Sequence, residues 1–196
     1  MNKTILTKMP SVSLLDEGEA AKVSRQDVPL ADIYRYITGE EAKDATLALR
    51  AADSTEQQRC IKRKRFKACT PHGTFYQRRK QENLIQESGM MVIDFDHLTP
   101  GQHAELLQRL PLDQRYETEL MFTSPSGHGI KWFIACGSHE GATFRSLFED
   151  ICLHICGEYG VRPDPSGKDL PRCCFLPWDP QCYINPRFIA PTATNA

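Results

Sequence analysis

The chain has 196 residues, of which 40% are hydrophobic and 25% are charged, and its formal net charge is −1. This length is sufficient for one sizeable core, and the balanced charge excludes any inference about partners from net charge alone. No apolar run approaches the roughly 18 residues that cross a bilayer. Residues 1–15 also lack the continuous apolar block of a signal peptide. We therefore expect a cytoplasmic protein without a membrane partner, whose eight cysteines are reduced.

The N-terminal part predicts a small helical and basic lobe. We expect a short strand at residues 12–15, a helix that begins after Pro29 and ends at Gly39, and a second helix over residues 40–52. Residues 59–68 (RCIKRKRFKA) hold six basic side chains, and an aromatic residue and three more cations follow closely. Cations interleaved with aromatics suit a nucleic-acid backbone and its bases, although an isolated charge run also fits a solvated face or a localisation signal. The expected nucleic-acid-binding residues are Lys62, Arg63, Lys64, Arg65, Phe75, Arg78 and Arg79.

From residue 89 onward the hydrophobic pattern alternates between strand and helix. It predicts a strand at 91–96, a helix at 100–110, strands at 119–123 and 130–136, a helix at 143–158 and a last strand at 173–177. This β-α-β-β-α-β order is the split arrangement of ferredoxin-like and RNA-recognition-type folds, with four antiparallel strands under two helices. We predict an α+β fold in which residues 1–88 form the N-terminal lobe and 89–186 the RNA-recognition-like lobe of one compact domain. Residues 187–196 have the composition of a tail or linker, as expected for the first domain of a longer protein.

Two aspartates, Asp94 and Asp96, lie at the end of the predicted apolar strand. Side chains at positions i and i+2 of a strand point to the same face, so both carboxylates project together while Phe95 faces the other way. Like charges held this close repel each other, and divalent cations relieve the repulsion. The pair therefore predicts a metal site that can act on phosphates, although it also fits a solvent-facing strand end or a turn.

A glycine turn, Ser124-Pro-Ser-Gly-His-Gly-Ile-Lys131, joins the two middle strands of this pattern. Tight glycine turns expose backbone N–H groups that bind anionic oxygens, and Ser124 and Ser126 add hydroxyl donors. Lys131 follows Gly129 by two residues and is placed to reach a phosphate as a point charge. An ordinary hairpin also uses glycines, but together with the upstream acidic pair the turn predicts a phosphate-binding loop.

The segment from Asp164 to Asp179 offers three further carboxylates, since Asp169 lies between them. A two-metal site usually needs a carboxylate beyond the first pair, while each of these residues taken singly also fits a solvated loop. Arg172 lies in the same segment, and its guanidinium matches phosphate oxygens bidentately. It is therefore expected to clamp a triphosphate or a template.

These stretches together resemble the archaeo-eukaryotic primase superfamily, the primase-polymerases. The similarity covers residues 60–186, and the nearest resemblance is to the branch found as an N-terminal domain of bacterial mobile-element proteins, beside virulence-associated-protein-E-type helicases. The ordered set of motifs that carries the resemblance is Lys62 to Phe66, Gly73-Thr74-Phe75, Asp94-Phe95-Asp96, Ser124 to Lys131, Asp164, Arg172-Cys173-Cys174-Phe175 and Asn185-Pro186.

The resemblance implies a DNA primase-polymerase that joins NTPs or dNTPs on a nucleic-acid template with Mg²⁺ or Mn²⁺, with a helicase as a possible partner. Its metal ligands would be Asp94, Asp96 and Asp164, with Asp179 and then Asp169 as alternatives for the third. Lys131, which completes the catalytic set, stands where the wider superfamily has a histidine; it keeps the positive charge without the imidazole geometry. The implied nucleotide-binding residues are Ser124, Ser126, Gly127, His128, Gly129, Lys131 and Arg172. The alternatives are a non-catalytic nucleic-acid-binding module of the same fold and a two-metal nuclease.

Overall fold

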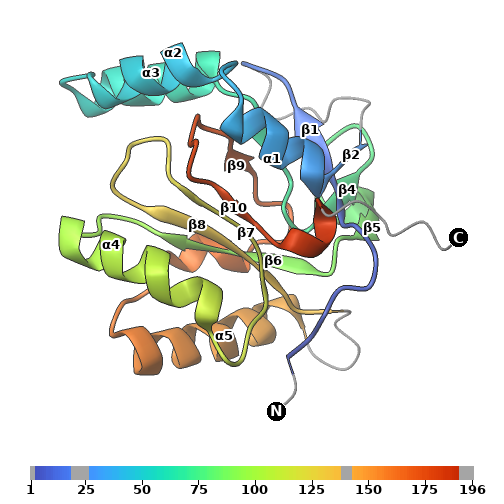
Figure 1. The fold of residues 1–196 in the computed structure, drawn as a ribbon. Coiled ribbons are helices and arrows are strands. Elements are labelled where there is room, and N and C mark those ends of the chain that lie inside the picture. Colours follow the sequence, from blue (N-terminus) through green and yellow to red (C-terminus); the bar gives the residue numbers. More distant parts are fainter. Residues whose placement is uncertain (1–2, 19–26, 138–142, 190–196) are drawn as a thin grey trace, which may run out of the picture.

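The computed structural model describes residues 3–18, 27–137 and 143–189, which form a mixed α+β arrangement with antiparallel sheets (Figure 1). This confirms the α+β class of the predicted fold. The helices are α1 (Leu30–Thr38), α2 (Lys43–Arg50), α3 (Thr55–Arg65), α4 (Pro100–Arg109) and α5 (Phe144–Tyr159). The strands are β1 (Ser11–Leu15), β2 (Asp27–Pro29), β3 (Ala68–Cys69), β4 (Gly73–Phe75), β5 (Leu84–Glu87), β6 (Met90–Phe95), β7 (Thr118–Thr123), β8 (Ile130–Ala135), β9 (Cys174–Phe175) and β10 (Tyr183–Ile184).

The central sheet has the strand order β10-β7-β8-β6, and each neighbouring pair is antiparallel. Strand β8 lies between β6 and β7, which run in the same direction and are joined through α4, so the predicted split β-α-β unit is present. The fourth strand lies beside β7, however, and not beside β6 as in a ferredoxin-like sheet. The sheet therefore shares the order of elements along the chain with that fold but differs in the position of its last strand.

Residues 173–177, predicted as the last strand of the central sheet, belong to a different sheet. Its central part is β9, which pairs with β3 in a second sheet of order β2-β1-β3-β9, while Tyr183–Ile184 supplies the fourth strand of the central sheet. The apolar composition of 173–177 shows that the segment is buried but does not say which strand it pairs with. As a result, a C-terminal segment completes the N-terminal sheet, and residues of both lobes pack together in one of the hydrophobic clusters.

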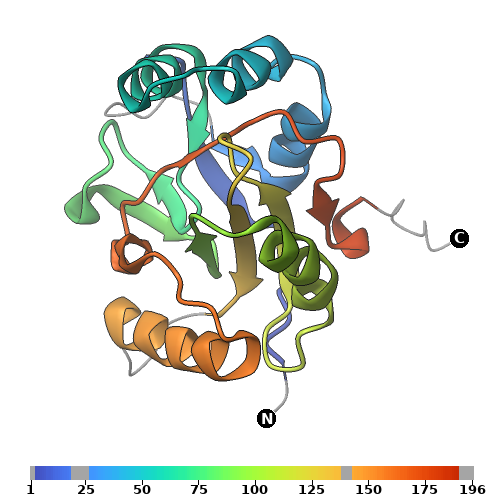
Figure 2. The ribbon, with the colours of Figure 1, turned by 90° about the vertical axis from the view of Figure 1, so that its left-hand side faces the viewer.

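The central sheet is covered on both faces, and the alternation along β6 shows how (Figures 1 and 2). Met91, Ile93 and Phe95 pack in the cluster that contains the buried residues of α4 and α5. Met90 and Val92 pack on the opposite face, in the cluster that contains α1 and the N-terminal sheet. Because side chains alternate along a strand, Asp94 also faces the N-terminal lobe.

The basic stretch forms a helix, α3, for which the sequence analysis assigned no regular structure. Ser54 caps its N-terminus by accepting a hydrogen bond from the Gln57 N–H, and none of its residues is buried. Phe66, immediately after its last turn, packs with Ala45 and Leu49 of α2. Phe66 and the contacts with α2 therefore attach α3 to the domain. The rest of the surface of α3 is rich in cations.

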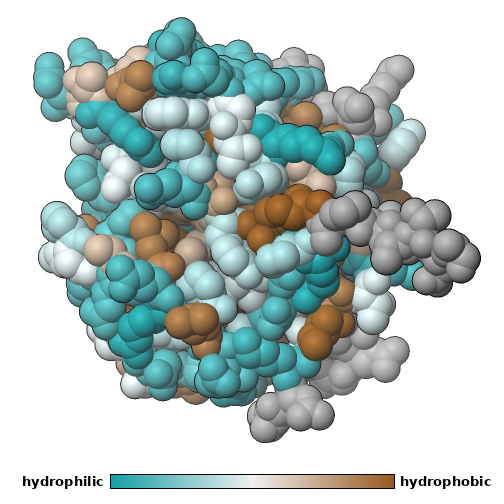
Figure 3. Space-filling model, in the orientation of Figure 1, coloured by the Kyte–Doolittle hydropathy of each residue, from teal (hydrophilic) through white to brown (hydrophobic). Residues whose placement is uncertain are grey.

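The face shown in Figure 3 is largely hydrophilic, and its apolar side chains are scattered over it. Across the described residues, no helix has both the length and the apolar composition needed to cross a bilayer.

Candidate metal and nucleotide site

Three carboxylates converge at the end of β6. Asp94 lies in the strand, Asp96 is the first residue after the strand, and Asp164 approaches from the segment after α5. One carboxylate oxygen from each lies within 4.8 Å of the others. Asp94 is buried, Asp164 is half-buried and Asp96 is exposed, so the cluster extends from the interior to the surface. The structure therefore brings together the three residues that the resemblance implied as metal ligands.

Asp164 is held here because its segment docks on the open edge of β6. Its backbone N–H donates to the carbonyl oxygen of Asp94 at 2.8 Å, and its carboxylate accepts from the Ser166 N–H at 2.8 Å. A Cβ on Gly167 would lie 2.6 Å from Cε2 of Phe148 and 3.2 Å from the Val92 carbonyl oxygen. A residue without a side chain is therefore needed where the segment approaches the strand.

The other two carboxylates suggested as alternatives lie in different surroundings. The carboxylate of Asp179 accepts hydrogen bonds from the N–H groups of Thr123 at 2.7 Å and Gln181 at 3.0 Å, so it supports the fold around β7. Asp169 is exposed at the wall of the cavity and is not part of the cluster of three. The geometry therefore favours Asp164 as the third member.

Two cations contact this cluster. Lys131 lies directly opposite Asp94 on β8, and its Nζ forms an ion pair with Asp94 Oδ2; both side chains are almost fully buried. Arg172 places Nη2 3.6 Å from Asp94 Oδ2 and 3.6 Å from Asp164 Oδ2. Among the described residues, three carboxylates thus share two cations at ion-pair distance.

The protonation properties reflect this imbalance. Burial raises the pKa of the Asp94 carboxyl and Asp96 adds to the effect, while Lys131 and Arg172 act in the opposite direction. Burial alone would lower the pKa of Lys131, but the attraction of Asp94 outweighs it, and that pKa is raised. Burial likewise opposes ionisation of Asp164, yet hydrogen bonds from Ser166 and the charge of Arg172 lower the pKa of its carboxyl. The shifts at Asp94 and Lys131 both indicate a site that favours additional positive charge.

The residues present fit a divalent cation. Asp94 Oδ1 is buried and has no hydrogen-bond partner among the described residues, although buried polar atoms are normally satisfied. Carboxylate oxygens are the ligands preferred by Mg²⁺ and Mn²⁺. An orphaned oxygen beside two further carboxylates is therefore an arrangement that a bound metal ion would complete.

A cavity of about 950 Å³ opens over the cluster, within the size range of small-molecule sites. Of the residues that the structure describes, the cations Lys62, Arg79, Lys131, Arg145, Lys168 and Arg172 and the acids Asp94, Asp96 and Asp169 line it. Two of these cations, Arg145 in the first turn of α5 and Lys168 in the segment after it, are not among the predicted site residues. Neither belongs to a charge run or a glycine turn, so no local signal distinguishes them from ordinary surface residues.

The glycine turn forms one wall of this cavity through Ser124, Pro125 and Ser126. A Cβ on Gly129 would lie 2.2 Å from the carbonyl oxygen of Phe95, which explains the glycine by close packing of the turn against β6. His128 is exposed and does not line the cavity.

The backbone of the turn is also held from outside. Gly127 adopts a left-handed conformation with φ of 84°, and its N–H donates to the Ser124 carbonyl at 2.9 Å. Arg50 of α2, which the sequence analysis did not identify, donates from Nε to the Pro125 carbonyl at 3.3 Å. The N-terminal lobe therefore contacts the turn directly.

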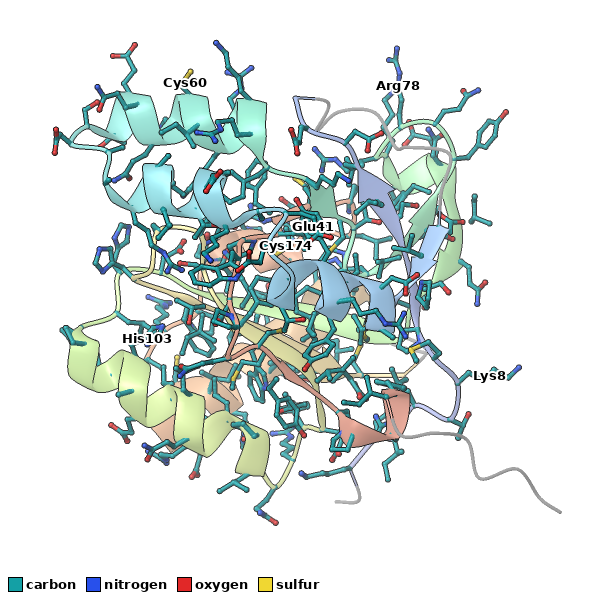
Figure 4. All side chains as sticks on the ribbon, turned by 45° about the horizontal axis from the view of Figure 1, so that its top comes forward. Lys8, Glu41, Cys60, Arg78, His103 and Cys174 are labelled. Atoms are coloured by element: carbon teal, nitrogen blue, oxygen red, sulfur yellow. The ribbon has the colours of Figure 1, made fainter. Side chains whose placement is uncertain are left out.

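The predicted nucleic-acid-binding cations are divided between two elements. Lys62 reaches the cavity from α3, where burial and then the charge of Lys131 lower its pKa, while Arg63, Lys64 and Arg65 are exposed on the same helix. Arg79 also lines the cavity and donates from Nη1 to the Pro171 carbonyl at 2.6 Å. Arg78 is exposed and projects outward from the segment after β4 (Figure 4). In the same view, the label of Cys60 marks α3.

The structure corrects the role predicted for Phe75. Phe75 is 2% exposed; it lies within β4, beside β1, and its backbone N–H donates to Ser13 Oγ at 2.9 Å. A buried ring offers no face on which a base can stack. The adjacent Tyr76 is 63% exposed and is the aromatic side chain available to a ligand at this position.

The fold and the site define an α+β domain with an acidic cluster in a cavity lined by cations. Residues 61–184, more than half of the chain, match the family described as BT4734-like, N-terminal domain, and the chain belongs to this family. Neither the curated proteins nor the solved structures contain a match to the chain.

Proposed function

We propose that this domain is a metal-dependent nucleotidyltransferase, a DNA primase-polymerase that joins NTPs or dNTPs on a nucleic-acid template. The observation that carries the proposal is the buried Asp94 Oδ1, which has no hydrogen-bond partner in the described part of the chain and lies within a cluster of three carboxylates, at the base of a cavity whose walls are cationic. An acidic centre suits metal ions, and cationic walls suit the phosphates of a nucleotide. The two features together support phosphoryl or nucleotidyl transfer better than either does alone.

Asp94, Asp96 and Asp164 would hold Mg²⁺ or Mn²⁺. When bound, such ions polarise a phosphate and neutralise the charge that develops on the attacking and leaving oxygens.

The cations of the chain have complementary tasks. Lys131 balances the charge of Asp94, and a metal ion bound to that carboxylate would make this ammonium group available to phosphate oxygens. Arg172 lies beside the same carboxylates and offers a planar fork for bidentate contacts. Ser124 and Ser126 border the same space and supply hydroxyl donors.

Catalysis in this proposal consists of positioning and charge neutralisation. The 3′-hydroxyl of the growing strand attacks the α-phosphate of the incoming nucleotide, and pyrophosphate leaves. The exposed cations of α3 and the ring of Tyr76 lie outside the carboxylate cluster and would contact the template.

Incubation of the chain with a primed template, labelled dNTPs or NTPs, and Mn²⁺ tests this function. The proposal predicts incorporation by the wild type and loss of at least two orders of magnitude of activity in Asp94→Asn and Asp96→Asn (about 10²-fold or more for a lost charge-stabilising group). Lys8→Met is a matched control, because this exposed lysine projects from the N-terminal segment (Figure 4) and should leave incorporation unchanged. Cleavage of the template by the wild type would instead identify a nuclease. Binding without any reaction would identify a recognition module and refute the proposal.

A further inference from the structure

His72 is a buried residue with no role in the site described above. It lies in the segment between β3 and β4, and its side chain and backbone together are 2% exposed. Its ring accepts from the backbone N–H of Val92 in β6 at 3.2 Å through Nε2, and its Nδ1 lies 3.0 Å from the carbonyl oxygen of Leu170. The ring also packs against Phe144 of α5, with centroids 4.6 Å apart.

These contacts determine the tautomer of the ring. A backbone N–H can only donate, so Nε2 must be the unprotonated acceptor for Val92. A carbonyl oxygen can only accept, so Nδ1 must carry the proton that is donated to Leu170. His72 is thus neutral and forms both hydrogen bonds at once. Protonation of Nε2 would place its N–H opposite the N–H of Val92, so that the hydrogen bond to Val92 would be lost.

The two backbone groups belong to the two segments that form the site. Val92 precedes Asp94 by two residues on the open edge of β6, and Leu170 precedes Arg172 by two residues. The main chain of His72 is itself anchored, because its carbonyl accepts from the Ser88 N–H at 3.0 Å. A fixed ring therefore spans the gap between the strand that carries Asp94 and the segment that carries Arg172.

We propose that His72 is a positioning residue that sets the location of Arg172 relative to Asp94 through the hydrogen bond from Nδ1 to Leu170. The Asp164 end of the same segment has its own attachment, since its N–H bonds to Asp94 and Gly167 packs on Val92. Loss of the His72 tether should therefore displace Arg172 more than Asp164. The consequence for nucleotide binding rests on the function proposed above, but the positioning itself does not.

Two substitutions separate the two hydrogen bonds. Asparagine places its amide near the position of Nδ1, so His72→Asn can keep the bond to Leu170 and loses the bond to Val92. Glutamine places its amide near the position of Nε2, so His72→Gln can keep the bond to Val92 and loses the bond to Leu170. Both variants sacrifice one buried hydrogen bond, so comparable melting temperatures are expected.

The first readout is amide hydrogen exchange of residues 164–172 in the full chain, which requires no activity. The proposal predicts faster exchange at Arg172, whose N–H bonds to the Asp169 carbonyl, in His72→Gln but not in His72→Asn. The Asp164 amide should change little in either variant. Equal exchange at Arg172 in the two variants, or faster exchange in His72→Asn, would overturn the proposal.

The second readout is nucleotide incorporation. His72→Gln should raise the KM for dNTP by about tenfold, in the range found for residues that orient a site from behind its first contacts, and leave kcat within about twofold. Because His72 acts through Arg172, the double variant His72→Gln/Arg172→Gln should lose no more than Arg172→Gln alone. Additive losses would refute this route. A wild type that incorporates nothing would refute the proposed function, while the exchange measurement would still decide the role of His72.

Discussion

The ion pair between Lys131 and Asp94 is the most informative interaction to remove. Lys131→Met keeps the length and the apolar stem of the side chain and deletes the charge. Asp94 would then be left in the interior, and among the described residues Arg172, 3.6 Å away, would be the cation still at ion-pair distance. The variant therefore measures how strongly Asp94 requires a positive charge beside it.

The expected loss of stability is large. Removal of one partner of a buried ion pair costs about 3–5 kcal/mol, because the other charge remains buried without compensation. For a domain of this size, each 1 kcal/mol lowers Tm by about 2–4 °C, so Tm should fall by on the order of 10 °C at neutral pH. Burial already raises the pKa of Asp94, and loss of Lys131 raises it further. In the folded variant the Asp94 carboxyl therefore keeps its proton at pH values above the unfolded pKa of about 3.9. The loss of unfolding free energy relative to the wild type is small at acid pH, and it grows as the pH rises through the folded pKa of Asp94.

Thermal unfolding with and without Mn²⁺ tests this reasoning. A metal ion bound at the proposed site would supply the missing charge, so Mn²⁺ should raise the Tm of Lys131→Met by several degrees more than that of the wild type. Lys168→Met, which removes another cation of the same cavity, is the matched control and should lack this enhanced response. An unchanged Tm in Lys131→Met without metal, or equal responses to Mn²⁺ in all three proteins, would refute the idea that Lys131 neutralises a metal-binding carboxylate.

Three further predictions follow from single residues. Gly129→Ala should lose about 1–3 kcal/mol of unfolding free energy in urea titrations, because its Cβ would lie 2.2 Å from the Phe95 carbonyl oxygen; an unaltered midpoint would contradict the packing argument. Burial raises the pKa of Glu119 to about 7 despite its ion pair with Arg187. The contribution of protonated Glu119 to the free energy of unfolding is therefore complete below an unfolded pKa of about 4.3 and is lost as the pH rises toward 7. Glu119→Gln should therefore flatten the pH dependence of stability in this window, and a profile identical to that of the wild type would disprove it. Tyr76→Ala should weaken binding of single-stranded DNA by about 1–3 kcal/mol in fluorescence titrations without changing Tm; full retention of affinity would exclude stacking on this ring.

Local patterns predicted the parts of the fold that short-range physics determines. The helix after Pro29 begins and ends as expected, because proline at its start and glycine after its end are signals within the segment itself. The alternation along residues 91–96 also predicted that Asp94 and Asp96 share a face, and their carboxylates do meet in one cluster. Strand periodicity alone is sufficient for that inference.

Long-range contacts account for what the sequence did not reveal. The partner of β9 is β3, more than 100 residues earlier, and apolar composition cannot specify such a pairing. Phe75 is an aromatic residue of the type that stacks on bases, but its position beside β1 buries it. Tyr76, at the next position, is exposed. Sequence offered three candidates for the third carboxylate, and only the docking of the Asp164 segment on β6 distinguishes among them.

Under the proposed function, Asp94, Asp96 and Asp164 hold a metal ion beside a bound triphosphate. Anomalous scattering from crystals grown with MnCl₂ and a non-hydrolysable dNTP analogue measures this directly. We predict a manganese peak coordinated by these carboxylates, with Lys131 turned from Asp94 toward the phosphates. A crystal in which manganese and nucleotide bind elsewhere, while Lys131 remains paired with Asp94, would contradict the account.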